Sequence, residues 1–207
     1  MNGVTLDEEN NRKKIAMKTL SLYLAAISLI FISCKDENKE KEMEESTDVE
    51  VVETVDKEKR ITFMLESRSG STATGKVSFA EMDGEVSMEA SLSGLEPGTH
   101  AIHIHEKADC SAADATSSGG HWNPTFENHG KWGDEEGFHR GDIGNFEADD
   151  AGHGSIRLTT DLWCLGCDDE KKNVLGKAIV VHQGADDFTS QPSGAAGARV
   201  SCGGIIE

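Results

Sequence analysis

Residues 76–92, KVSFAEMDGEVSMEASL, constrain the fold more strongly than any other stretch of the chain. Apolar side chains alternate with polar ones on both sides of Asp83-Gly84, first at Val77 and Phe79 and then from Val86 onward. Asp-Gly between two alternating segments is typical of the tight turn that joins antiparallel strands. The stretch therefore predicts a β-hairpin with one apolar face.

Further short alternating segments follow, separated by turns, and glycine is frequent, with 22 residues in the chain. We expect strands within 61–68, 100–106, 153–163, 175–183 and 198–206, and long glycine-rich loops at about 106–141 and 183–198. Loops of this length inside a compact domain are usually functional or disordered. Because no βαβ rhythm is present, the sequence predicts an all-β fold, an antiparallel sandwich or barrel.

The first 60 residues differ from the rest in composition. In residues 1–33 a basic segment, NRKKIAMK, precedes the apolar run LSLYLAAISLIFIS, and Cys34 follows directly. This layout resembles a bacterial lipoprotein signal with lipid on the Cys34 sulfur, and Met17 within the basic segment points to an upstream mis-start. An ordinary signal peptide or membrane anchor, with an incidental Cys34, is the alternative. Residues 34–60 read as an acidic tether, and 61–207 as the folded domain.

Charge and cysteine content narrow the function further. A formal net charge of −18 argues against nucleic acid as a partner, since phosphates would repel it. Lipidation of Cys34 leaves four of the five cysteines, enough for two disulfides in an oxidising compartment. Cys164 and Cys167, in WCLGC, could form a local disulfide, bind a metal or act as a redox pair. The lack of a second Cys/His cluster favours the disulfide.

The histidines carry the functional signal. In HAIHIHE, His103 and His105 share one face of the expected strand, and His100 lies on the apolar face, where a core histidine bonded to backbone is expected. His153 matches no ligand pattern and is expected in an exposed turn. One H-x-H pair is a weak metal signal, but five more candidate ligands, four histidines and one aspartate, occur in long loops or at a strand end. Imidazole suits copper and zinc, and an added carboxylate favours zinc.

The motifs HIHE, GGHWNP, NHG, HRGDIGN, VVHQGADD and GARVSCG resemble those of copper/zinc superoxide dismutases in order and spacing, over about residues 61–207. The resemblance implies a Greek-key β-fold and one copper and one zinc per chain. The copper ligands that it implies are His103, His105, His121 and His182. The zinc ligands that it implies are His121, His129, His139 and Asp142, with His121 shared between the metals.

The resemblance also assigns roles around the metals. Arg199 would hold the anionic substrate beside the copper, and His121 would take part in catalysis. Asp186 would link His103 to His129, and Cys110 would form a disulfide with Cys202. The expected reaction is dismutation of superoxide to O₂ and H₂O₂ by a copper redox cycle.

Two aspects stay open at this point. The loop QGADDFTSQPSGAAGA contains no lysine, so only Arg199, or Lys107 and Lys131 from the other long loop, could attract the superoxide anion. The expected location is the cell envelope, with the membrane as a partner through Cys34 and a homodimer as one possible assembly. The alternative function is a non-catalytic copper/zinc-binding envelope lipoprotein, which would need no arginine beside the copper.

Overall fold

A computed structural model describes residues 58–207 of the chain. The predicted signal segment, Cys34 and most of the predicted tether lie outside the described residues. Within residues 58–207, no helix has the length and apolar character needed to cross a bilayer.

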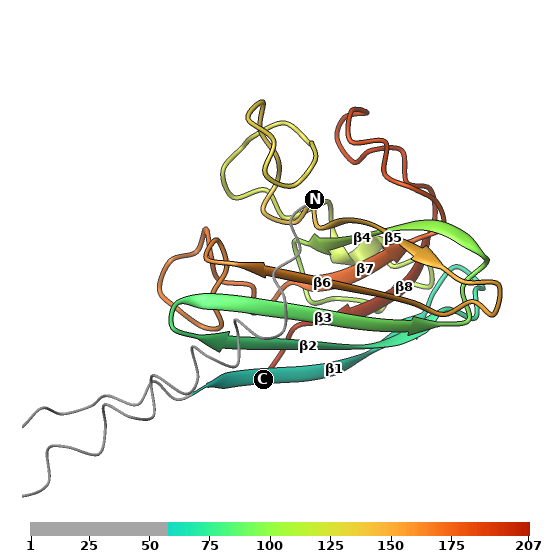
Figure 1. Cartoon of the computed structure of the whole chain (residues 1–207), viewed down its shortest axis with the longest axis horizontal. Coiled ribbons are helices and arrows are strands. Elements are labelled where there is room, and N and C mark those ends of the chain that lie inside the picture. Colours follow the sequence, from blue (N-terminus) through green and yellow to red (C-terminus); the bar gives the residue numbers. More distant parts are fainter. Residues whose placement is uncertain (1–57) are drawn as a thin grey trace, which may run out of the picture. The chain divides into compact units, whose positions relative to one another are not determined.

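Eight strands form a closed antiparallel barrel in the order β1-β2-β3-β6-β5-β4-β7-β8 (Figure 1). The all-β prediction is confirmed. Strand β3 pairs with β6 and β4 pairs with β7, so the connections from β3 to β4 and from β6 to β7 cross between strands that are not adjacent. The long loop of residues 106–143 joins β4 to its neighbour β5. A single 3₁₀ turn, Thr116–Ser118, interrupts this loop. The strands are β1 (Lys59–Ser67), β2 (Thr74–Met82), β3 (Glu85–Ser93), β4 (Gly98–His105), β5 (Gly144–Ala148), β6 (Gly154–Thr160), β7 (Ala178–His182) and β8 (Arg199–Gly204).

The predicted hairpin is the pair β2–β3, whose turn residues Asp83 and Gly84 have φ angles of 54° and 80°. Two successive positive φ angles match the right-handed twist of the flanking strands. Strand β5, by contrast, was not among the predicted strands. Strand β5 is only five residues long, and Phe146 is its one large apolar side chain, so its sequence shows no alternating pattern. Its pairing with β4 stabilises it instead.

The barrel interior is filled by the alternating apolar residues of the strands. Trp163 is fully buried in this core and packs against Phe79 and Trp132. Strand β4 is buried on both faces. Ile102 and Ile104 belong to the core, so His103 and His105, which alternate with them, face the other way. The two long loops lie on that side of the barrel (Figure 1). The fold therefore places a buried polar layer between β4 and the long loops.

Two smaller predictions concern histidines that are not candidate ligands. His100 is 3% exposed, and its ring nitrogens lie 2.9 Å from the carbonyl oxygen of His182 and 2.7 Å from that of Glu96, as expected of a core histidine. His153 is exposed in the turn between β5 and β6. Trp122, which follows His121 within the long loop, is buried in the core cluster.

Two disulfides are present among the described residues. Cys110–Cys202 ties the loop after β4 to strand β8 across a sequence separation of 92 residues. For a closed loop of that length the chain-entropy model gives about 4–5 kcal/mol of stabilisation. Cys164–Cys167 closes a loop of only a few residues, which corresponds to the local disulfide that the sequence favoured.

Candidate metal centre

Two clusters of buried ligand residues lie side by side and share His121. Within each cluster, one ligand atom from every residue lies within 4.8 Å of the others. The first cluster consists of His103, His105, His121 and His182, and the second of His121, His129, His139 and Asp142. These are the seven residues that the sequence singled out for copper and zinc, and the fold brings all of them together.

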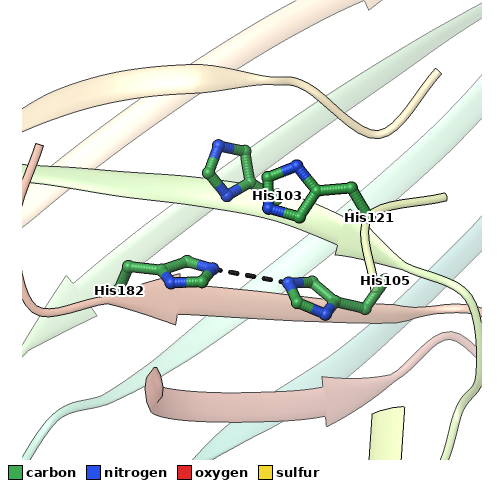
Figure 2. Close-up of side chains that lie close together, drawn as sticks. All are labelled: His103, His105, His121 and His182. Atoms are coloured by element: carbon green, nitrogen blue, oxygen red, sulfur yellow. Dashed lines mark hydrogen bonds between the residues drawn. The ribbon is translucent and has the colours of Figure 1, made fainter. Parts of the chain in front are cut away.

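The first cluster is assembled from three parts of the chain. Strand β4 supplies His103 and His105, β7 ends at His182, and an isolated β-bridge pairs His105 with His121 of the long loop. The register between β7 and β8 shifts at Val181/His182, where β7 ends. Figure 2 shows the four rings turned toward a common space, with 3.4 Å between the Nε2 atoms of His105 and His182.

The second cluster is arranged around the carboxylate of Asp142. Its Oδ1 lies 2.9 Å from His121 Nδ1 and 3.2 Å from His139 Nδ1, and its Oδ2 lies 3.0 Å from His129 Nδ1. The backbone N–H groups of His139 and Gly130 donate to Oδ2 at 2.8 Å and 3.2 Å. Asp142 is therefore fixed from outside while three imidazole nitrogens converge on it from inside.

The unpaired polar atoms of the site fit bound metals. Four buried ring nitrogens form no hydrogen bond of good geometry among the described residues: Nδ1 of His103, His129 and His139, and Nε2 of His121. For His129 and His139, the nearby carboxylate of Asp142 gives an ion-pair distance only. Leaving a buried polar atom unpaired costs about 1–3 kcal/mol, so four within one site demand a compensating ligand. All four belong to residues of the two clusters. A set of nitrogens alone suits copper, and three nitrogens with a carboxylate make a closed set for zinc.

Hydrogen bonds on the far side of the rings fix which nitrogen faces each cluster. Asp186 accepts from Nε2 of His103 at 2.8 Å and from Nε2 of His129 at 2.9 Å, which links the two clusters. Nδ1 of His105 donates to the carbonyl oxygen of Gly119 at 2.9 Å. Such partners orient a ligand and set its tautomer. The nitrogens left free are those that point inward.

Burial also lowers the pKa of three of these imidazoles and keeps them neutral at neutral pH. Desolvation, followed by the neighbouring histidines, lowers the pKa of His105 to about 2 and that of His182 to about 3. Desolvation likewise dominates at His121, whose pKa falls to about 4 despite its bond to Asp142. Neutral imidazole is the form that binds a metal, so these rings are ready to bind at neutral pH.

His129 behaves differently because it lies between two carboxylates. Burial alone would lower its pKa, but the carboxylates of Asp142 and Asp186, which lie close to its two ring nitrogens, raise that pKa to about 9. A metal bound at a nitrogen of this ring would have to displace a proton from it.

A pocket of about 510 Å³ opens onto both clusters and carries one cation among the residues lining it, Arg199. The guanidinium is held in place by Nη1, which donates to the carbonyl oxygen of Ala115 at 2.7 Å and to Oγ of Ser118 at 3.2 Å. Lys107 and Lys131 are absent from the described lining. A small anion that enters the pocket therefore meets one fixed positive charge next to the first cluster.

Comparison with known proteins agrees with this geometry. A family model described as copper/zinc superoxide dismutase matches residues 73–205, most of the folded part of the chain. The chain belongs to the copper/zinc superoxide dismutase family. Copper and zinc are the metals of this family, and each of the two clusters offers a ligand set suited to one of them.

Several members of the copper/zinc superoxide dismutase family are similar to the chain along most of the barrel. "Superoxide dismutase [Cu-Zn] 2" of Aquifex aeolicus is 36% identical over 135 residues, which is 63% of this chain and 78% of that protein. An "Extracellular superoxide dismutase [Cu-Zn]" of Haemonchus contortus is 39% identical over 126 residues, 58% of this chain and 66% of that protein. A solved SOD-like protein from Bacillus subtilis has 32% identity and a TM-score of 0.62, covering 70% of this chain and 97% of its own.

Sequence reasoning missed two carboxamides beside this superoxide dismutase-like site. Asn145 of β5 pairs with both backbone groups of Asp186, at 2.8 Å each. Gln191 pairs in the same way with the backbone of His129, at 2.9 Å each. Amide side chains in loops are common and carry no spacing signal, so only the fold reveals these contacts.

Proposed function

We propose that the protein dismutates superoxide, converting two superoxide anions and two protons into O₂ and H₂O₂. The observation that carries this proposal is the pair of buried ligand clusters that share His121 and open into a pocket containing Arg199. Membership in the superoxide dismutase family supports the same reaction.

Each ligand set binds a different metal, and the two metals have different roles. In this proposal His103, His105, His121 and His182 hold copper, and His121, His129, His139 and Asp142 hold zinc. When bound, copper supplies a one-electron redox couple that is reduced by one superoxide and oxidised by the next, and zinc supplies a fixed positive charge without redox chemistry. The residues of the chain orient both ligand sets, bind the anion and move the proton.

His121 is suited to the proton step because its two ring nitrogens face different clusters. Nδ1 lies 2.9 Å from Asp142 Oδ1 in the zinc set, and Nε2 faces the copper set without a hydrogen-bond partner. Nε2 can therefore hold a proton and pass it to the departing peroxide while Nδ1 stays fixed. A low pKa, about 4, favours release of that proton.

Arg199 is assigned the binding of superoxide. Its guanidinium lines the pocket next to His105 and His182, and two hydrogen bonds to neighbouring residues hold it there. Glu106 and Glu127 also line the pocket and disfavour an approaching anion. Arg199 consequently has to supply the local attraction that the acidic surface does not.

The first test replaces this arginine. We expect Arg199→Ala to lower the dismutation rate roughly 10- to 100-fold with both metals retained, because charge-assisted bonds to the anion contribute about 1.5–3 kcal/mol. The parent rate should stay flat or rise slightly from low to moderate salt. Screening over about 8 Å mutes distant carboxylates more than a charge inside the pocket. The measurement is superoxide decay by pulse radiolysis or stopped flow at several salt concentrations.

Arg157→Ala is the matched control, since Arg157 lies on β6, is exposed and pairs with Glu89 outside the pocket. It should leave the rate unchanged. A steep fall of the parent rate with salt, reduced by neutralising Lys107 and Lys131, would instead show that these lysines attract the substrate. A metal-storage function predicts full metal content and no turnover, with no effect of Arg199→Ala.

Location and domain layout form a separate part of the proposal. We propose that residues 1–33 are a lipoprotein-type signal, that Cys34 carries the lipid, that 34–60 form a tether and that 61–207 form the enzyme domain, which would protect the cell envelope. Two disulfides among the described residues are consistent with an extracytoplasmic protein. The relatives from Haemonchus contortus and Caenorhabditis elegans, both named extracellular superoxide dismutases, support the same location.

A single substitution tests the lipid anchor. Cys34→Ser should move the protein from the membrane fraction to the soluble fraction and remove incorporation of a radiolabelled or clickable fatty acid. Removing the thiol removes the atom that would carry the lipid, and dismutation by the released protein should be unaffected. Membrane pelleting and acyl labelling equal to those of the parent would rule out Cys34 as the attachment site.

A further inference from the structure

The side-chain amide of Gln191 makes a two-bond pairing with the backbone of His129. The N–H of His129 donates to Oε1 of Gln191 at 2.9 Å, and Nε2 of Gln191 donates to the carbonyl oxygen of His129 at 2.9 Å. The pairing uses both polar groups of one peptide residue, as a neighbouring β-strand would. Both polar atoms of the Gln191 amide are engaged in this pairing, and Gln191 is not one of the seven residues of the two clusters.

His129 is held from its other side by the carboxylate of Asp186, and Gly194 packs directly on that contact. A Cβ at Gly194 would lie 1.8 Å from Asp186 Oδ1 and 2.6 Å from His129 Nε2. Any side chain at this position would displace the bond between Asp186 and His129. The φ angle of Gly194, +66°, adds a backbone conformation that favours glycine.

The segment that carries Gln191 and Gly194 is braced internally. Asp187 Oδ1 accepts from the backbone N–H groups of Thr189 and Ser190 at 2.9 Å and 2.8 Å. The backbone N–H of Asp187 donates to the carbonyl oxygen of Gly194 at 3.0 Å, and that of Gly194 donates to the carbonyl oxygen of Ser190 at 2.7 Å. These bonds hold residues 187–194 in place against the long loop that carries His129.

We propose that Gln191 is a positioning residue for the zinc set. It fixes the backbone of His129 so that Nδ1 points into the cluster while Nε2 stays on Asp186, and Gly194 provides the space for this arrangement. The loop between β7 and β8 thereby tunes the affinity for zinc through a residue that never touches the metal. This inference rests on the assignment of His129 to zinc in the proposed function.

The test compares Gln191→Leu with Gln183→Leu in the full chain. Gln183 is exposed at the start of the same loop. Its side chain forms no hydrogen bond to the described residues, so it is the matched control. Zinc affinity is measured by competition with a chromophoric chelator, and Co²⁺ serves as a spectroscopic probe of the same set. We expect Gln191→Leu to weaken zinc binding about 10-fold and to shift the visible Co²⁺ bands.

Two further readouts separate positioning from a general structural role. Copper affinity should match that of the parent, and the melting temperature of the metal-free protein should fall less than that of the zinc-loaded protein. Gln191→Glu, which keeps the acceptor for the His129 N–H but cannot donate to its carbonyl oxygen, should show an intermediate zinc affinity. Gly194→Ala should weaken zinc binding more than Gln191→Leu, since it displaces the bond between Asp186 and His129.

The outcomes distinguish this inference from the function on which it rests. Equal zinc affinity in Gln191→Leu and Gln183→Leu, alongside a large loss in His129→Ala, would overturn the positioning role and leave the zinc set intact. Unchanged zinc affinity in His129→Ala would overturn both. A loss shared by zinc affinity, copper affinity and metal-free stability in Gln191→Leu would show a merely structural role.

Discussion

His182→Ala is expected to abolish dismutation while the barrel stays folded and zinc stays bound. His182 belongs to the copper set and not to the zinc set, and it ends strand β7 rather than filling the core. Truncation removes one of four nitrogens, and the remaining three hold copper more weakly and with altered geometry. The expected loss is about 1,000-fold or more, measured as superoxide decay by protein incubated with both metals.

His153→Ala provides the control, because His153 is an exposed histidine outside both clusters. It should retain the parent rate and the parent content of both metals. Copper content and circular dichroism of His182→Ala show whether the loss comes from the metal or from the fold. Turnover at the parent rate by His182→Ala containing zinc alone would refute the copper assignment.

Asp142→Ala is expected to have its largest effect on stability. Its carboxylate lies within 3.2 Å of three imidazole nitrogens and also accepts two backbone N–H groups. A metal that binds only the folded state adds about 3–4 kcal/mol at 100 to 1,000 times its dissociation constant. Losing the stabilisation by bound zinc should lower the melting temperature of the zinc-treated protein by roughly 5–15 °C. Copper chemistry should be partly retained.

Calorimetry with and without zinc separates the metal from the hydrogen bonds. Asp142→Ala also loses two backbone bonds, so the informative quantity is the rise in melting temperature that zinc produces in each protein. Asp150→Ala, an exposed carboxylate in the turn before β6, should respond to zinc as the parent does. An equal rise in Asp142→Ala and the parent would exclude Asp142 from zinc binding.

The histidine pattern illustrates how much could be predicted from sequence. Period-two alternation in HAIHIHE was sufficient to separate the core histidine from the pair His103 and His105, and the structure has this arrangement. No spacing rule, however, brings His129 of one long loop next to Asp186 of another, 57 residues away. Only the resemblance to a known family supplied that contact, because non-local pairs depend on the closed barrel.

The remaining discrepancies have local physical causes. Strand β5 was missed because GNFEA carries one large apolar side chain and acquires its conformation from pairing with β4. Gln191 was missed because its partner is a backbone amide, which every residue has. Lys107 and Lys131 were candidates for attracting substrate, yet the described pocket lining holds only Arg199 as a cation. Side-chain direction in long loops is set by contacts that a sequence pattern does not contain.

One measurement tests the central claim most directly: copper content, zinc content and superoxide turnover determined on the same purified sample of the full chain. The account predicts about one copper and one zinc per chain and a rate proportional to copper occupancy across partially loaded samples. Zinc-only protein should have no activity. Full loading with both metals and no superoxide turnover, or turnover independent of copper occupancy, would contradict the proposed function.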